Sequence, residues 1–91
     1  MAIILTRINV GDYDAWKPMF DEGRTRVREA AKGHRILRGV EDPNEVFVQV
    51  EFASSEDANA ARERLLASGA LDRVTVKAGP TVADEAETVG Y

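Results

Sequence analysis

The side chains best suited to chemistry are a few polar residues set among β-branched and aromatic residues. Arg38 lies in the segment 34–40, close to His34, which is the only histidine of the chain. A fixed guanidinium in a dry site stabilises an enolate-like or phenolate-like oxygen. An imidazole, which titrates near neutral pH, carries a proton in such reactions. We therefore take Arg38 and His34 as the candidate catalytic residues.

Several other kinds of chemistry find no support in the sequence. The chain has no cysteine, so it offers no thiolate nucleophile and no disulfide. No cluster of His, Cys and carboxylate residues has the spacing of a metal site. There is no glycine-rich phosphate loop and no nucleophile–base motif. We therefore expect neither a metal nor an organic cofactor.

Length and charge limit the class of protein. The 91 residues predict a single domain over 1–91, and a domain of this size buries only about two-thirds of its unfolded surface. With 12 basic and 16 acidic residues the net charge is −4, which repels nucleic acids and anionic lipids. The longest apolar run, 2–5, is far too short for a membrane span or a signal peptide. We expect a cytoplasmic protein that binds neither nucleic acid nor membrane.

The first half of the chain predicts a strand followed by a long helix. Segment 2–10 is rich in β-branched residues, as strands are. Segment 15–32 places apolar residues at helical spacing, with Asp14 as the expected N-cap and Pro18 in the first turn. Gly33 is expected to end this helix in the left-handed cap position.

The second half predicts two strands, a second helix and a last strand. Segments 34–40 and 45–53 are joined by the turn residues of 41–45. Ser54 and Asp57 form a capping signature for a helix that ends before Gly69. A short helical turn or extended chain follows in 70–80, and the acidic stretch 81–89 predicts an edge strand.

This order of elements, β-α-β-β-α-β, predicts an α+β fold of the ferredoxin-like type. Its four-stranded antiparallel sheet would carry both helices on one face and leave the other face uncovered.

The length of the turn at 41–45 decides which residues share the uncovered face, because a shift of one residue exchanges the two faces of a strand. We expect an even loop with Asp42 opposite Glu45, so that Arg38 faces Gln49. An odd loop would place Arg38 among the valines, where an unpaired buried guanidinium is costly. The residues expected to pack under the helices are then Leu37, Val46, Val48, Val50 and Phe52.

With this register, polar and apolar side chains mix on the uncovered face. The candidate ligand-binding residues are Arg7, Asn9, Ile36, Phe47, Gln49 and Glu51, with Tyr13 at the mouth of the site. Such a face exposes too much apolar area for a monomer, so we expect a homodimer that encloses a cavity between two sheets. Arg38, Glu51 and Arg7 would either converge on a small-molecule ligand or form an ion-pair network between subunits.

Two stretches of the sequence resemble a known superfamily. The stretches are VGDYDAWKPMFDE at 10–22 and HRILRGVEDPNEVFVQVEF at 34–52, followed by an alanine-rich helix. Over residues 4–69 they resemble small bacterial proteins of the dimeric α+β barrel superfamily, which includes antibiotic-biosynthesis monooxygenase-like proteins. The resemblance implies a homodimer in which two four-stranded sheets face each other as a barrel, with the helices outside.

The superfamily includes cofactor-independent quinone-forming monooxygenases, haem-degrading oxygenases, isomerases and cyclases. The haem-degrading type uses an Asn, a Trp and a His; Asn9 matches the first, but Trp16 and His34 do not occupy the corresponding places. The resemblance implies a monooxygenase-like or isomerase/cyclase-like enzyme acting on a small cyclic or aromatic molecule. The alternative is a non-catalytic ligand-binding or structural homodimer.

Overall fold

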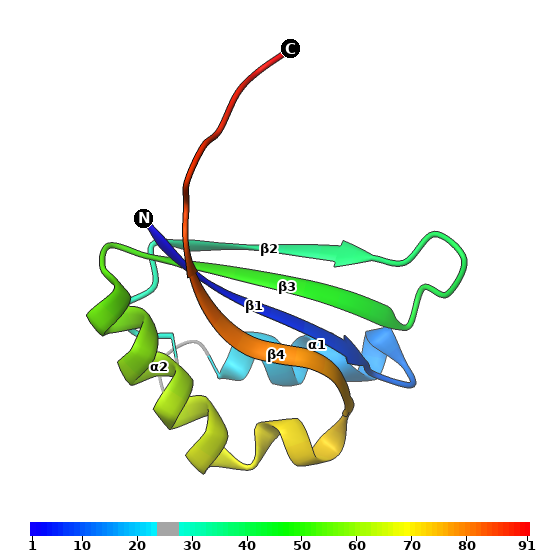
Figure 1. Ribbon diagram of the computed structural model, residues 1–91. Coiled ribbons are helices and arrows are strands. Elements are labelled where there is room, and N and C mark those ends of the chain that lie inside the picture. Colours follow the sequence, from blue (N-terminus) through cyan, green and yellow to red (C-terminus); the bar gives the residue numbers. More distant parts are fainter. Residues whose placement is uncertain (24–27) are drawn as a thin grey trace.

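The computed structural model describes residues 1–23 and 28–91, which form one four-stranded antiparallel sheet and two helices. The elements are β1 (Ala2–Asn9), α1 (Tyr13–Glu22), β2 (Gly33–Arg38), β3 (Glu45–Phe52), α2 (Ser55–Ser68), the short 3₁₀ helix η1 (Ala70–Arg73) and β4 (Thr75–Asp84). The strand order β2-β3-β1-β4, with both helices below the sheet (Figure 1), agrees with the predicted ferredoxin-like arrangement. No helix of the described residues is long and apolar enough to cross a membrane.

The core lies between the sheet and the helices. It is built on the alternation of β3, whose Val46, Val48, Val50 and Phe52 are all buried, as predicted. Because successive side chains of a strand point to opposite faces, this alternation places one apolar row against the helices. The buried core consists of Ala2, Ile4, Ile8, Val46, Val48, Val50, Phe52, Ala58 and Ala61.

The start of α1 differs from the prediction. Asp12, not Asp14, is the N-cap, and its carboxylate accepts hydrogen bonds from the N–H groups of Asp14 (3.0 Å) and Ala15 (3.4 Å). Pro18 consequently lies inside the helix rather than in its first turn. The reason is that an aspartate two residues earlier can satisfy two of the free N–H groups at the helix start.

The end of α1 also differs. The helix stops at Glu22, and Gly23 follows with φ −71°. Residues 28–32 are not helical, and Gly33 is the first residue of β2. The prediction of a helix over 15–32 is therefore wrong at 28–32, and the prediction that Gly33 ends the helix is wrong as well. Positions 24–27 of that prediction lie outside the described residues. Glycine is a poor helix former, and it ends this helix after about three turns.

The second half follows the prediction closely. The Ser54 hydroxyl accepts a hydrogen bond from Asp57 N–H (3.2 Å), and Gly69 ends α2 in the left-handed conformation with φ 76°. The helical turn appears as η1, and β4 is an edge strand that starts earlier and ends earlier than predicted. It bends at Gly79, which has φ 82° and lies so close to the Leu5 carbonyl that a Cβ would collide with it.

The pairing of β2 with β3 shows that the prediction of an even loop between these strands is wrong. Arg38 pairs with Val46 and Ile36 pairs with Val48, so both lie on the helix-covered side. Leu37, predicted to lie under the helices, pairs with Phe47 on the uncovered face. The placement of Asp42 opposite Glu45 is therefore wrong.

Arg38, whose expected burial was the reason for predicting the other register, is not buried. Arg38 lies at the end of β2, where it remains exposed. Its guanidinium lies 3.9 Å from the centre of the Tyr13 ring, and its Nε donates a hydrogen bond to the Pro43 carbonyl (2.8 Å). Because the charge keeps its contact with water and gains these partners, the desolvation cost expected for this register does not arise.

Candidate functional site

The observed register divides the candidate site residues between the two faces of the sheet. The uncovered face holds Arg7, Asn9, Phe47, Gln49 and Glu51. The helix-covered side holds Tyr13, His34, Ile36 and Arg38. The structure therefore does not bring the nine residues together around one cavity.

The candidate catalytic residues are also separated from each other. His34 and Arg38 are four positions apart in the extended strand β2, which corresponds to roughly 13 Å. His34 contacts the edge of the Phe20 ring, with 5.2 Å between the ring centroids, whereas Arg38 lies over Tyr13. A small substrate cannot place one reacting atom against both side chains.

Between these two residues, aromatic rings follow one side of α1. The ring centroids of Tyr13 and Trp16 are 5.8 Å apart, and those of Trp16 and Phe20 are 5.0 Å apart. All three rings are partly buried and pack against the core. They form an apolar wall between α1 and the sheet.

On the uncovered face, Arg7 and Asn9 have local partners. Arg7 forms an ion pair with Glu45, and its guanidinium lies 5.5 Å from the centre of the Phe47 ring. The Asn9 amide donates to Asp42 Oδ2 (3.2 Å) and accepts from Gly11 N–H (3.0 Å), which joins the two turns at this end of the sheet. The contacts of Asn9 thus suit a structural role.

The best-formed hollow lies on the opposite side, between α1, α2, η1 and the sheet. Its volume is about 280 Å³. The side chains that make its wall are mainly apolar and include Ile4, Trp16, Phe20, Val48, Leu65 and Leu71. Thr6 and Ser68 add hydroxyl groups, and Glu22, Arg28 and Arg73 add charged ones. Of the candidate site residues, none lines this pocket.

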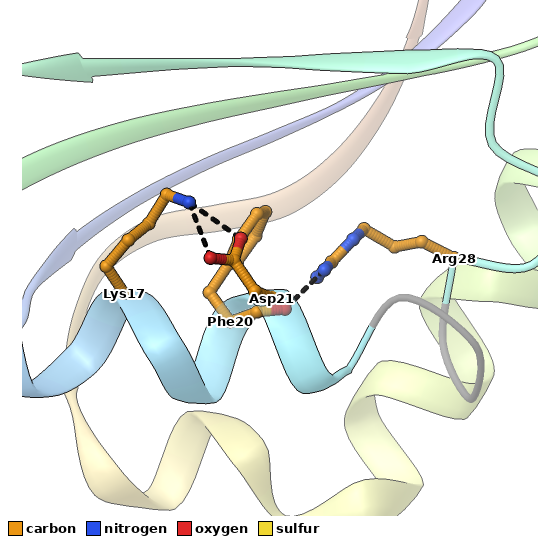
Figure 2. A network of polar contacts seen from close by, with 4 residues as sticks. All are labelled: Lys17, Phe20, Asp21 and Arg28. Carbon is orange, nitrogen blue, oxygen red and sulfur yellow. Dashed lines mark hydrogen bonds and ion pairs between the residues drawn. The ribbon is translucent and has the colours of Figure 1, made fainter.

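The charged residues near the end of α1 are held by specific contacts. Figure 2 shows Lys17, Asp21 and Arg28 beside the C-terminal half of this helix. Arg28 donates a hydrogen bond to the Phe20 carbonyl and lies 3.7 Å from the centre of the Phe20 ring. The Lys17 ammonium donates to both Asp21 oxygens (2.6 and 2.8 Å), and this hydrogen bond is the main reason that the pKa of Asp21 is lowered. Arg28 thus places a cation on the pocket wall and supplies a partner to the end of α1.

Sequence reasoning missed this pocket because its wall consists of residues assigned to the core. The signal that was present is the spacing of Trp16 and Phe20, which puts two large rings on one side of a helix, against alanines in the other helix. Within the described residues, no group of three or more His, Cys, Asp or Glu side chains could hold a metal ion. No protein-family model and no curated protein matches this chain.

Proposed function

We propose that the chain binds a small cyclic or aromatic molecule in the pocket between its helices and its sheet. The observation that carries this proposal is the hollow of about 280 Å³ with a largely apolar wall. Binding sites for small molecules are typically apolar hollows of roughly 300–1,000 Å³ with a few polar groups. The volume is therefore suited to a ligand of one or two rings.

The chemistry of the wall supports this ligand class. Trp16 and Phe20 present aromatic rings, which prefer offset or edge contacts with another ring. A ligand that buries about 200 Å² of apolar surface gains about 5 kcal/mol before the costs of association. A gain of about 5 kcal/mol alone would correspond to a Kd of roughly 0.2 mM. Because the costs of association reduce this gain, we expect weak binding, with a Kd in the millimolar range for an unoptimised ligand.

Of the two functions that the sequence left open, ligand binding without catalysis has the better support. A monooxygenase-like or isomerase-like reaction through Arg38 and His34 would require both side chains at one substrate. Their positions at the two ends of β2 oppose this.

We also propose that the protein is a homodimer of the dimeric α+β barrel kind. The support is the uncovered face of the sheet, where Leu5, Leu37 and Phe47 are 39%, 44% and 37% exposed. The same face carries Arg35 and Glu51, which have opposite charges. A two-fold axis can therefore bring each charge to its opposite while the apolar residues are buried.

The fluorescence of Trp16 provides the test of the pocket, because Trp16 is the only tryptophan and lines the wall. The protein is titrated with a panel of one-ring and two-ring aromatic compounds, such as 1-naphthol, up to millimolar concentration. We expect a saturable change in emission. If no compound of the panel produces one, the proposal is wrong.

Two adjacent leucines of α2 provide a matched control. Leu65 lines the pocket, whereas Leu66 is 48% exposed and does not. Leu65→Arg should abolish ligand binding, because the long cationic side chain enters the apolar hollow. Leu66→Arg should leave the Kd unchanged. Equal effects of the two substitutions would place the ligand elsewhere.

A further inference from the structure

We infer that the ligand of the pocket is an aromatic acid, whose carboxylate binds Arg73 while its ring lies in the apolar hollow. This inference rests on the proposed function and names the chemical class that the site selects. The observations are the charges on the wall of the pocket and the partners of its polar side chains.

The charged side chains on the wall of the pocket have a positive excess. Among the described residues that line it, Arg28 and Arg73 oppose one carboxylate, that of Glu22. The chain as a whole carries a net charge of −4, so this excess is the reverse of what its composition provides. A local field of this sign favours an anionic ligand over a neutral or cationic one.

The two arginines differ in how far their charge is already compensated. Arg28 donates a hydrogen bond to the Phe20 carbonyl (Figure 2) and lies over the Phe20 ring at the end of α1. Glu22 is the last residue of the same helix, so the two opposite charges at this end offset each other. Arg73 comes from a different element, because it is the last residue of η1. The positive excess therefore lies with Arg73.

Arg73 is available to a ligand. It is exposed, and within residues 1–23 and 28–91 it forms neither an ion pair nor a cation–π contact. Its neighbour Asp72 is exposed and does not line the pocket. An arginine presents a planar fork of N–H groups, which matches the two oxygens of a carboxylate and binds them through charge-assisted hydrogen bonds. We therefore assign the acidic group of the ligand to Arg73.

The hydroxyl groups of the wall leave this selection to the charge. Ser68 donates to the Leu65 carbonyl (2.7 Å) and accepts from Ala70 N–H (3.2 Å), so its hydroxyl is bound at the end of α2. Thr6 adds another hydroxyl. Because a hydroxyl both donates and accepts, it can bind an acid, an amide or an alcohol. An acid and an amide of the same shape consequently differ mainly in their interaction with the charged groups.

Benzoate and benzamide test this difference, because they have nearly the same shape and differ in charge. Both are titrated into the protein at about pH 7.5 and constant ionic strength, up to about 50 mM, and the emission of Trp16 is followed. We expect a Kd for benzoate at least fivefold lower than that for benzamide. Equal values, or binding of 1-naphthol without binding of benzoate, would overturn the inference and leave the proposed function in place. Absence of saturation with all three compounds would overturn both.

Arg73→Met and Arg64→Met form a matched pair of variants. Arg64 is an exposed residue of α2 that does not line the pocket, and its replacement changes the net charge equally. Arg73→Met should raise the Kd of benzoate at least fivefold and leave that of benzamide within twofold, which also shows that the pocket is intact. Arg64→Met should change neither value more than twofold. Unchanged benzoate binding in Arg73→Met, or an equal loss for both ligands, would overturn the assignment, as would an equal loss of benzoate binding in both variants.

Discussion

The two helices pack on the same side of the sheet with side chains of very different size. α2 presents alanines, and Ala58 and Ala61 are buried against the strands. α1 has no fully buried residue and presents the rings of Tyr13, Trp16 and Phe20 instead. Small side chains allow close approach of a backbone, while large rings hold it away. The pocket is the space left between a closely packed helix and a more distant one on the same side of the sheet.

Enlarging a residue of the closely packed helix should have the largest effect. Ala58→Leu adds three carbon atoms at a position with no exposed surface, so we expect a loss of about 3 kcal/mol in the free energy of unfolding. Ala60→Leu, at an exposed position of the same helix, should change it by less than about 0.5 kcal/mol. Urea denaturation followed by circular dichroism measures both. Similar values for the two variants would mean that α2 is not closely packed.

Removing a ring from the distant helix should have a smaller effect. Trp16 is only partly buried, so we expect Trp16→Ala to cost about 2 kcal/mol, below the range for a fully buried tryptophan. Trp16→Phe keeps a ring in the wall and should cost less than half as much. The same urea titrations apply. A loss for Trp16→Ala larger than that for Ala58→Leu would contradict the difference between the helices.

The N-cap residues of α1 and α2 provide a further comparison of the two helices, with an expected loss of about 1 kcal/mol in the free energy of unfolding when a cap is removed. Asp12 accepts hydrogen bonds from two N–H groups of α1 and brings a negative charge to the helix start, whereas Ser54 accepts one from α2. Thermal denaturation should therefore show a greater loss for Asp12→Ala than for Ser54→Ala, each about 1 kcal/mol. Asp12→Asn should retain most of the stability. The reverse order would show that α1 depends less on its cap than α2.

The smallest effect concerns the ion pair on the exposed side of α1. The hydrogen bond from Lys17 lowers the pKa of Asp21, so Lys17→Met should return this pKa towards its ordinary value. Because the folded-state pKa is lowered, any stabilisation is complete above the unfolded-state pKa of about 4 and is lost as the pH falls through the lowered value. An NMR titration of the Asp21 carboxylate measures the shift. An unchanged pKa in the variant would show that Lys17 is not its cause.

Much of the fold could be predicted where the signal is local. Ser54 and Asp57 are three residues apart and define the start of α2 without reference to the rest of the chain. The alternating valines of β3 identify their own buried face. The end of α1 was harder, because apolar residues beyond Gly23 continue the helical spacing although the helix stops there.

The register of β2 and the pocket depend on contacts between distant elements. The prediction treated a guanidinium on the valine side as buried, but Arg38 reaches the ring of Tyr13 and the Pro43 carbonyl at the end of the strand. The distance between α1 and the sheet follows from how Trp16 and Phe20 stack, which no residue pattern states. Four of the nine candidate site residues therefore lie on the other side of the sheet from that expected.

The link between the two turns at one end of the sheet has a consequence for engineering. Asn44 accepts hydrogen bonds from Val10 N–H through its carbonyl (2.9 Å) and from Tyr13 N–H through its side chain (3.2 Å). Asp42 adds the bond from Asn9 already described. Exposed turns commonly accept inserted peptides or new chain ends. The turn at 41–45 should tolerate neither an insertion nor new chain ends, because an added residue would move Asn44 away from the N–H groups of Val10 and Tyr13. A reporter peptide inserted between Asp42 and Asn44 would thus loosen the start of α1 at Tyr13, which is 31 residues from Asn44 in the sequence.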